Sequence, residues 1–119
     1  MQDVLDMAVV DELLSLSDDG DPELLLDLIL LFLQDGPVRV ESLLQGLAAR
    51  DFDKMERAAH SLKGSSGNLG ARGLQHTCEQ LQLATRGHDL ATTQQLCPQL
   101  RTQFAAACAA LRALQQHYT

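Results

Sequence analysis

Apolar residues along most of the chain recur at intervals of three and four positions, the spacing that places side chains on one face of an α-helix. Residues 3–16 alternate acids with Val, Leu and Met, which predicts a short amphipathic helix. The segment 17–21 interrupts the pattern with Ser, Asp and Gly, and it lacks the alternating ligand spacing of a calcium loop. We therefore expect a break in which Asp21 caps the next helix and Pro22 takes its first position.

The second predicted helix runs from Glu23 to near Arg50. It is apolar almost all round as far as Leu33, which predicts burial on more than one side, with the first helix as its cover. Gly36-Pro37 interrupts the apolar pattern, which then resumes. A kink and a break both fit a proline at this place, and we expect one kinked helix.

Three further apolar stripes predict three more helices. The first of them ends at a turn around Gly70, and the next ends at Arg86-Gly87. Asp89 caps the last helix, which Pro98 should bend rather than end because the stripe continues on both sides. The stripes consist of Phe52, Met55, Ala59, Leu62, Ser66 and Leu69; Leu74, Cys78, Leu81 and Thr85; and Leu96, Leu100, Phe104, Ala107, Leu111 and Leu114. The predicted fold is all-α: an antiparallel up-and-down four-helix bundle with a short additional N-terminal helix.

Length and composition agree with this fold class. A chain of 119 residues and 13.0 kDa is expected to form a single domain over residues 1–119. A formal net charge of −7 argues against nucleic-acid binding.

The apolar block Leu24–Leu33 is too short to span a bilayer, and no signal peptide opens the chain. The cysteines at positions 78, 97 and 108 are odd in number and lie on apolar stripes, so we expect a reduced, cytoplasmic protein.

One segment, residues 58–70, breaks a local rule inside a consistent pattern. It holds three glycines, the last of them at the turn, and three serines, although an interior glycine costs a helix roughly 1 kcal/mol relative to alanine. On a helix that begins after an Asp51 cap, His60 lies roughly 130° from the middle of the apolar stripe and should face water. Lys63, Gly64 and Gly67 share its side, and the two glycines should leave the imidazole open to a large partner.

A second interpretation of this segment is a flexible loop at Gly64–Asn68. The helix would then end at Lys63, and His60 would be an ordinary surface residue. The apolar stripe, however, continues through Leu62, Ser66 and Leu69, so we favour the helix.

The sequence around His60 resembles the signature of histidine-containing phosphotransfer (HPt) domains, which carry a phosphoryl group between aspartates of receiver domains in phosphorelays. The resemblance covers nearly the whole chain. It rests on His60, Leu62, Lys63, Gly64, Ser65, Leu69, Gly70 and Ala71, continued by Leu74 and Cys78.

The resemblance implies a role for each residue around the histidine. His60 would accept the phosphoryl group, Lys63 would offset its charge, and Gln82 would hydrogen-bond the imidazole or the phosphoryl group. The expected partner-docking residues are Glu56, Arg57, Gly64, Gly67 and Arg86. The receiver domain would bring the aspartate and its Mg²⁺, so this chain would bind no cofactor and no metal of its own.

The expected partners are receiver domains of a hybrid sensor kinase and of a downstream regulator. No Walker or Rossmann glycine loop is present, so we expect no ATP binding and no autokinase activity. His76, His88 and His117 lack metal-ligand spacing and should be surface residues. We expect a monomer that binds neither nucleic acid nor membrane, and Met1 favours a free-standing protein. The alternative function is a non-catalytic helical adaptor that docks a partner through the His60 face.

Overall fold

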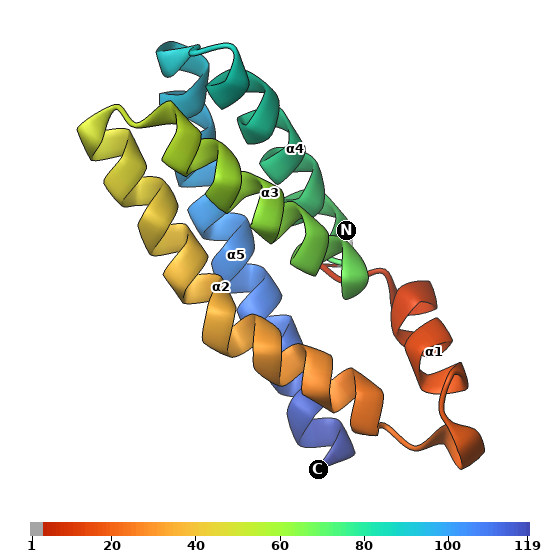
Figure 1. Ribbon diagram of the computed structural model, residues 1–119. Coiled ribbons are helices and arrows are strands. Elements are labelled where there is room, and N and C mark those ends of the chain that lie inside the picture. Colours follow the sequence, from red (N-terminus) through yellow and green to blue (C-terminus); the bar gives the residue numbers. More distant parts are fainter. Residues whose placement is uncertain (1–3) are drawn as a thin grey trace.

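The computed structural model describes residues 4–119, and every regular element in that range is a helix. Helices α2 to α5 each pack on the next along the chain, and α5 returns to α2, which closes an antiparallel up-and-down bundle (Figure 1). The predicted fold class is therefore confirmed. The elements are α1 (Met7–Ser15), the 3₁₀ turn η1 (Asp18–Gly20), α2 (Glu23–Ala49), α3 (Phe52–Asn68), α4 (Arg72–Arg86) and α5 (Leu90–Tyr118). No helix in the described range is long and apolar enough to cross a membrane.

The core consists of the predicted stripes. Met55, Leu62, Leu81, Leu100 and Leu111 are fully buried. Burial of such side chains is the main favourable term in folding, at about 25 cal/mol per Å² of apolar surface.

Helix α2 is continuous through Gly36-Pro37, as predicted, and its axis changes direction near the middle (Figure 1). A Cβ at Gly36 would lie 2.7 Å from the ring of Phe104, so glycine lets α5 pack directly against the α2 backbone. The helix begins at Glu23 as predicted, but Pro22 lies at the N-cap position and not at the first helical position. Asp21 still accepts a hydrogen bond from the Glu23 backbone N–H, at 3.0 Å.

The expectation that α2 is buried on more than one side is wrong. Leu25, Ile29 and Phe32 face the core, but Leu30 is 46% exposed and Leu31 is 60% exposed. Helix α1 is short and packs on α2 without covering this outer side. The nearly continuous run of leucines therefore contains both core residues and an apolar surface.

Helix α1 begins later than predicted, at Met7, and residue 3 of the predicted helix lies outside the described residues. The side chain of Asp6 caps the helix by accepting from the Ala8 N–H at 3.0 Å. The backbone N–H of Asp6 donates to the carbonyl of Gly70 at 2.8 Å. Arg72 Nε donates to the Asp6 carboxylate at 2.8 Å, and this hydrogen bond lowers the pKa of the Asp6 carboxyl. Because these contacts hold Asp6 outside the helix, α1 starts after it.

Gly70 is required by this junction for two reasons. Its φ of +78° lies in the left-handed region, and a Cβ there would approach the Asp6 carbonyl oxygen to 2.8 Å. We predict that Gly70→Ala destabilises the protein by more than the roughly 1–2 kcal/mol that left-handed backbone alone costs. Gly20→Ala is the matched control, since Gly20 has a φ of +70° but open space around it. Urea unfolding of both variants measures the difference, and equal losses would show that the contact with Asp6 does not matter.

Candidate functional site

Helix α3 runs without interruption through the glycine- and serine-rich segment as far as Asn68. Asp51 caps it by accepting from the Lys54 N–H at 3.0 Å. Ser66, fully buried on the core stripe, donates its hydroxyl proton to the Leu62 carbonyl within the helix. This back-bond satisfies a polar group that would otherwise be costly to bury. The interpretation of this segment as a loop is therefore wrong, and the helical prediction is confirmed.

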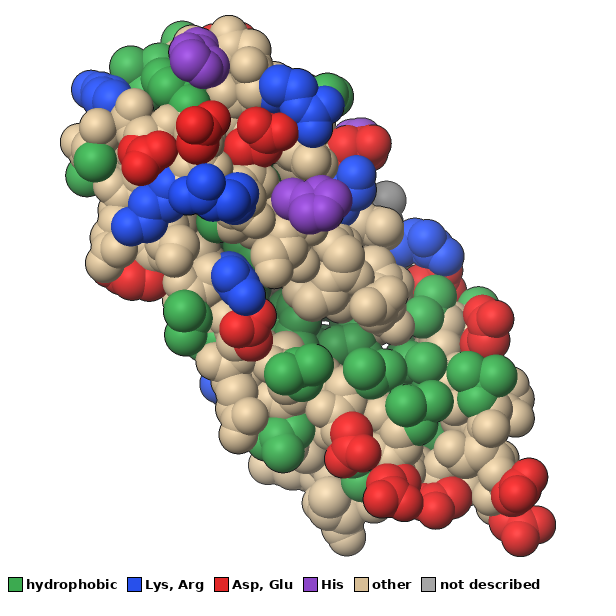
Figure 2. Space-filling model, viewed as in Figure 1, with side chains coloured by type: hydrophobic (Ala, Val, Ile, Leu, Met, Phe, Trp, Pro, Cys, Tyr) green, Lys and Arg blue, Asp and Glu red, His purple; other side chains and the backbone are tan. Residues whose placement is uncertain are grey.

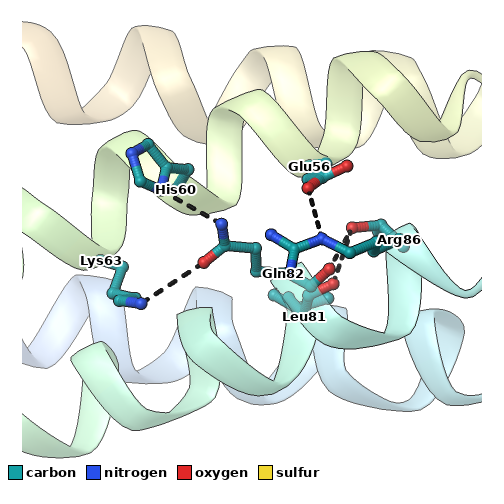
Figure 3. A network of polar contacts seen from close by, with 7 residues as sticks. Glu56, His60, Lys63, Leu81, Gln82 and Arg86 are labelled. Carbon is teal, nitrogen blue, oxygen red and sulfur yellow. Dashed lines mark hydrogen bonds and ion pairs between the residues drawn. The ribbon is translucent and has the colours of Figure 1, made fainter.

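His60 is exposed on the side of α3 that lies next to α4, while Ala59 and Leu62 are fully buried. Its Nδ1 lies 3.1 Å from Nε2 of Gln82 on α4. The other end of the Gln82 amide, Oε1, accepts from Lys63 Nζ at 3.5 Å (Figure 3). The structure thus brings together the three residues that the sequence placed at the reacting centre. The second ring nitrogen of His60, Nε2, forms no hydrogen bond within the described residues.

A second pair of residues links the same two helices beside this group. Arg86 Nε on α4 lies 2.9 Å from a carboxylate oxygen of Glu56 on α3 (Figure 3). Both side chains are partly exposed, so the pair adds little to stability. Arg57 is exposed on α3. Two of the five predicted docking residues therefore form an ion pair across the α3–α4 seam.

The two glycines near His60 have different surroundings. A Cβ at Gly64 would meet nothing within 4 Å, so this position is open as predicted. A Cβ at Gly67 would lie 2.5 Å from Nε2 of Gln75, because that side chain fills the space. The expectation of open space at Gly67 is wrong. Gly67 lets α4 pack closely against α3 at this level.

Comparison with known proteins places the chain in a family. Residues 27–114 match the sequence model of the Hpt domain. The chain belongs to the Hpt domain family. It is similar to the crystal structure of histidine-containing phosphotransfer protein B (HptB) from Pseudomonas aeruginosa PAO1, with a TM-score of 0.89, 29% identity and coverage of 100% of both chains.

Two curated relatives are longer than this Hpt domain. Multistep phosphorelay regulator 1 of Schizosaccharomyces pombe is 30% identical over 79 residues, which cover 66% of this chain and 27% of that protein. Histidine-containing phosphotransfer protein 1 of Oryza sativa subsp. japonica is 33% identical over 73 residues, which cover 60% of this chain and 50% of that protein. The match thus spans half the length of these relatives or less.

The three other histidines lie at the surface, and the cysteines lie in the core. His76, His88 and His117 are exposed as predicted, and the ring of His88 stacks on Phe52 with centroids 4.6 Å apart. Within residues 4–119, no group of three or more His, Cys, Asp or Glu side chains is arranged to hold a metal ion. The three cysteines are buried, and burial raises the pKa of the Cys78 thiol to about 12.

Sequence reasoning missed an apolar surface of the Hpt domain. Leu24, Leu31 and Val38 are 37%, 60% and 58% exposed, and their seven-residue spacing aligns them along α2. We call these three residues the α2 row. In the space-filling view, hydrophobic side chains gather over the first part of α2 and over α1 (Figure 2). The apolar run as far as Leu33 is visible in the sequence, but its pattern predicts that the first helix covers it.

A hollow connects the α2 row to the helix that carries His60. The hollow has a volume of about 300 Å³ and lies between α2 and the C-terminal half of α3. Leu31 contributes to one side, and Ser65 and Asn68 contribute to the other. The lining residues are Leu28, Leu31, Phe32, Asp35, Gly36, Arg39, Ser65, Asn68 and Leu69. The hollow therefore joins the α2 row to the C-terminal half of α3, and none of His60, Lys63 and Gln82 lines it.

Proposed function

We propose that this Hpt domain is a histidine phosphotransfer protein of a multistep phosphorelay. His60 accepts a phosphoryl group from the aspartate of one receiver domain and passes it to the aspartate of another. The observation that carries the proposal is an exposed imidazole that has one nitrogen unengaged, with Lys63 and Gln82 beside it and open space at Gly64. The names of the relatives from fission yeast and rice support the same function.

The chemistry asks little more of this chain than positioning and charge. Phosphoryl transfer depends mainly on alignment and electrostatic stabilisation. Nε2 of His60 points away from Gln82 and is the nitrogen that a partner can reach (Figure 3). Lys63 supplies a positive charge one turn further along α3. We infer that the receiver domain supplies the aspartate and a bound Mg²⁺.

The docking surface centres on α3 and includes the residues predicted from sequence. Arg57 and the Glu56–Arg86 pair lie beside His60, and Gly64 lets the partner approach the helix backbone. Gly67 belongs to this surface only indirectly, through the packing of Gln75. The α2 row extends the surface, because the hollow at Leu31 reaches α3. We infer a cytoplasmic monomer whose partners are receiver domains of a hybrid sensor kinase and of a downstream regulator.

His60→Gln tests the phosphoacceptor directly. Purified receiver domains encoded in the same genome are phosphorylated in the presence of Mg²⁺ and mixed with the protein. We expect acid-labile, base-stable label on the wild type and none on the variant. The variant should stay folded, because a solvent-facing polar substitution usually changes stability by about 0.5 kcal/mol or less. Binding of a receiver without labelling of the wild type would favour the adaptor, and labelling of His60→Gln would refute the assignment of His60.

A size series at Gly64 separates stability from transfer. Gly64→Ala should leave the melting temperature equal or higher, because alanine gains roughly 1 kcal/mol of helix propensity and meets no neighbour. The rate of labelling should fall from Gly to Ala to Gln, because the added atoms occupy the approach to His60. Gly73→Ala, at an exposed helical glycine on α4, should leave the labelling rate unchanged. A labelling rate that does not respond to size at Gly64 would contradict the docking role.

Leu31→Ser tests whether the α2 row takes part in docking. The matched control is Leu83→Ser on α4, since Leu31 and Leu83 are 60% and 61% exposed. We expect Leu31→Ser to weaken receiver binding roughly tenfold, the effect of about 1.4 kcal/mol at an interface. Leu83→Ser should have little effect. Titration calorimetry with the receiver that labels His60 fastest gives both affinities, and equal affinities would place the α2 row outside the interface.

A further inference from the structure

The side-chain amide of Gln82 connects Lys63 to the ring of His60. Lys63 Nζ donates to Oε1 of Gln82, and Nε2 of Gln82 faces Nδ1 of His60 (Figure 3). A lysine ammonium can only donate hydrogen bonds, so the end of the Gln82 amide that faces Lys63 must be the oxygen, Oε1. The amide NH₂ then points at His60, and Nδ1 must accept. A neutral ring in this arrangement carries its proton on Nε2.

This tautomer is unsuited to transfer through the exposed nitrogen. Attack on phosphorus needs a lone pair in the plane of the ring, and a protonated Nε2 has none. The other tautomer, with its proton on Nδ1, leaves the lone pair of Nε2 free. It also requires an acceptor beside Nδ1, which Gln82 provides only when its amide is turned so that Oε1 faces His60.

We propose that Lys63 controls the tautomer of His60 through Gln82. The inference rests on the proposed function of the site. An arriving phosphoryl group is an anion, and its hydrogen bond to Lys63 is stronger than that of a neutral amide. Lys63 therefore leaves Gln82 for the phosphoryl group. The freed amide turns about its terminal bond, Oε1 accepts from Nδ1–H, and the ring proton moves from Nε2 to Nδ1 through solvent. Lys63 is thus a positioning residue as well as a charge partner.

With the ring proton on Nδ1, phosphoryl transfer to Nε2 needs no additional general base. The bond between phosphorus and Nε2 forms as the bond between phosphorus and the aspartyl oxygen breaks. The aspartate leaves as a carboxylate with the bonding electron pair. The ring becomes a phosphorylated imidazolium that keeps its proton on Nδ1, where Oε1 of Gln82 accepts it. Reversal of the same steps returns the phosphoryl group to a second aspartate.

Nitrogen NMR of the 119-residue chain labelled with ¹⁵N-histidine tests the proposal without a partner. Protonated and unprotonated ring nitrogens have well-separated ¹⁵N shifts, so long-range proton–nitrogen correlations report the tautomer. The spectra are recorded over a pH series, and the tautomer is taken from the alkaline plateau of the ¹⁵N shifts. We expect wild-type His60 to carry its proton on Nε2.

Three variants separate the role of Lys63 from a general effect of charge. Lys63→Ala should shift the tautomer toward Nδ1–H, because the amide is no longer held. Gln82→Glu should invert the tautomer, since a carboxylate offers only acceptors to Nδ1. Arg57→Ala removes a positive charge from the same helix without touching Gln82 and should leave the tautomer unchanged.

The outcomes are decisive in both directions. A wild-type ring with Nδ1–H, a Lys63→Ala spectrum that matches Arg57→Ala, or a Gln82→Glu variant that keeps Nε2–H would each overturn the proposal. Such a result would leave the proposed function intact, because that function is tested separately by labelling of the wild type and loss of label in His60→Gln. Conversely, the expected tautomers in a protein that accepts no label would support the contact network and refute the proposed function.

Discussion

The site depends on the continuity of α3 through the segment from Gly64 to Gly67. If the helix ended at Lys63, neither Ser66 nor Leu69 would reach the core, and the face of α3 that carries His60 would end one turn after it. Continuity is sustained by burial on one side, where Met55, Ala59, Leu62 and Ser66 are all fully buried. Each interior glycine costs helix propensity, but packing of an amphipathic face outweighs propensity in most protein helices. Tertiary contacts therefore allow α3 to carry glycines on its exposed face beside His60.

Charge is distributed unevenly along the chain. The first 38 residues hold ten Asp and Glu and no Lys or Arg, so the remaining residues carry a net charge of +3 within a total of −7. The cations nearest the site, Arg57, Lys63 and Arg86, all lie after residue 38. Under the proposed function, an incoming phosphoryl group thus approaches the less acidic part of the molecule, although the protein as a whole repels anions. Such fields act mainly on encounter and orientation and weaken with salt.

The sequence was sufficient for the helix order and the exposed position of His60, because both follow from a strong helical period. It was insufficient where one residue serves two elements. Asp6 belongs to a predicted helix by pattern, yet its backbone and side chain contact Gly70 and Arg72, which are distant in sequence. Gly67 was expected to be open because its own helix offers no side chain there, whereas the occupying atoms come from Gln75 on α4. The exposed α2 row was missed because the sequence does not show where α1 packs. In the structure, α1 is too short to cover the whole apolar run of α2.

Structure and function occupy different faces of α3, and this separation explains why the site can be so sparse. The buried face determines where the helix lies between α2 and α4. That position in turn sets the distance between His60 and Gln82, so the reacting group needs only one hydrogen bond from a neighbouring helix to be oriented. No carboxylate within the described residues forms a hydrogen bond or ion pair with the imidazole, so the exposed ring nitrogen stays open to a partner. Under the proposed function, an Hpt domain built this way forms half of an active site: its fold supplies the geometry, and its receiver partner supplies most of the chemistry.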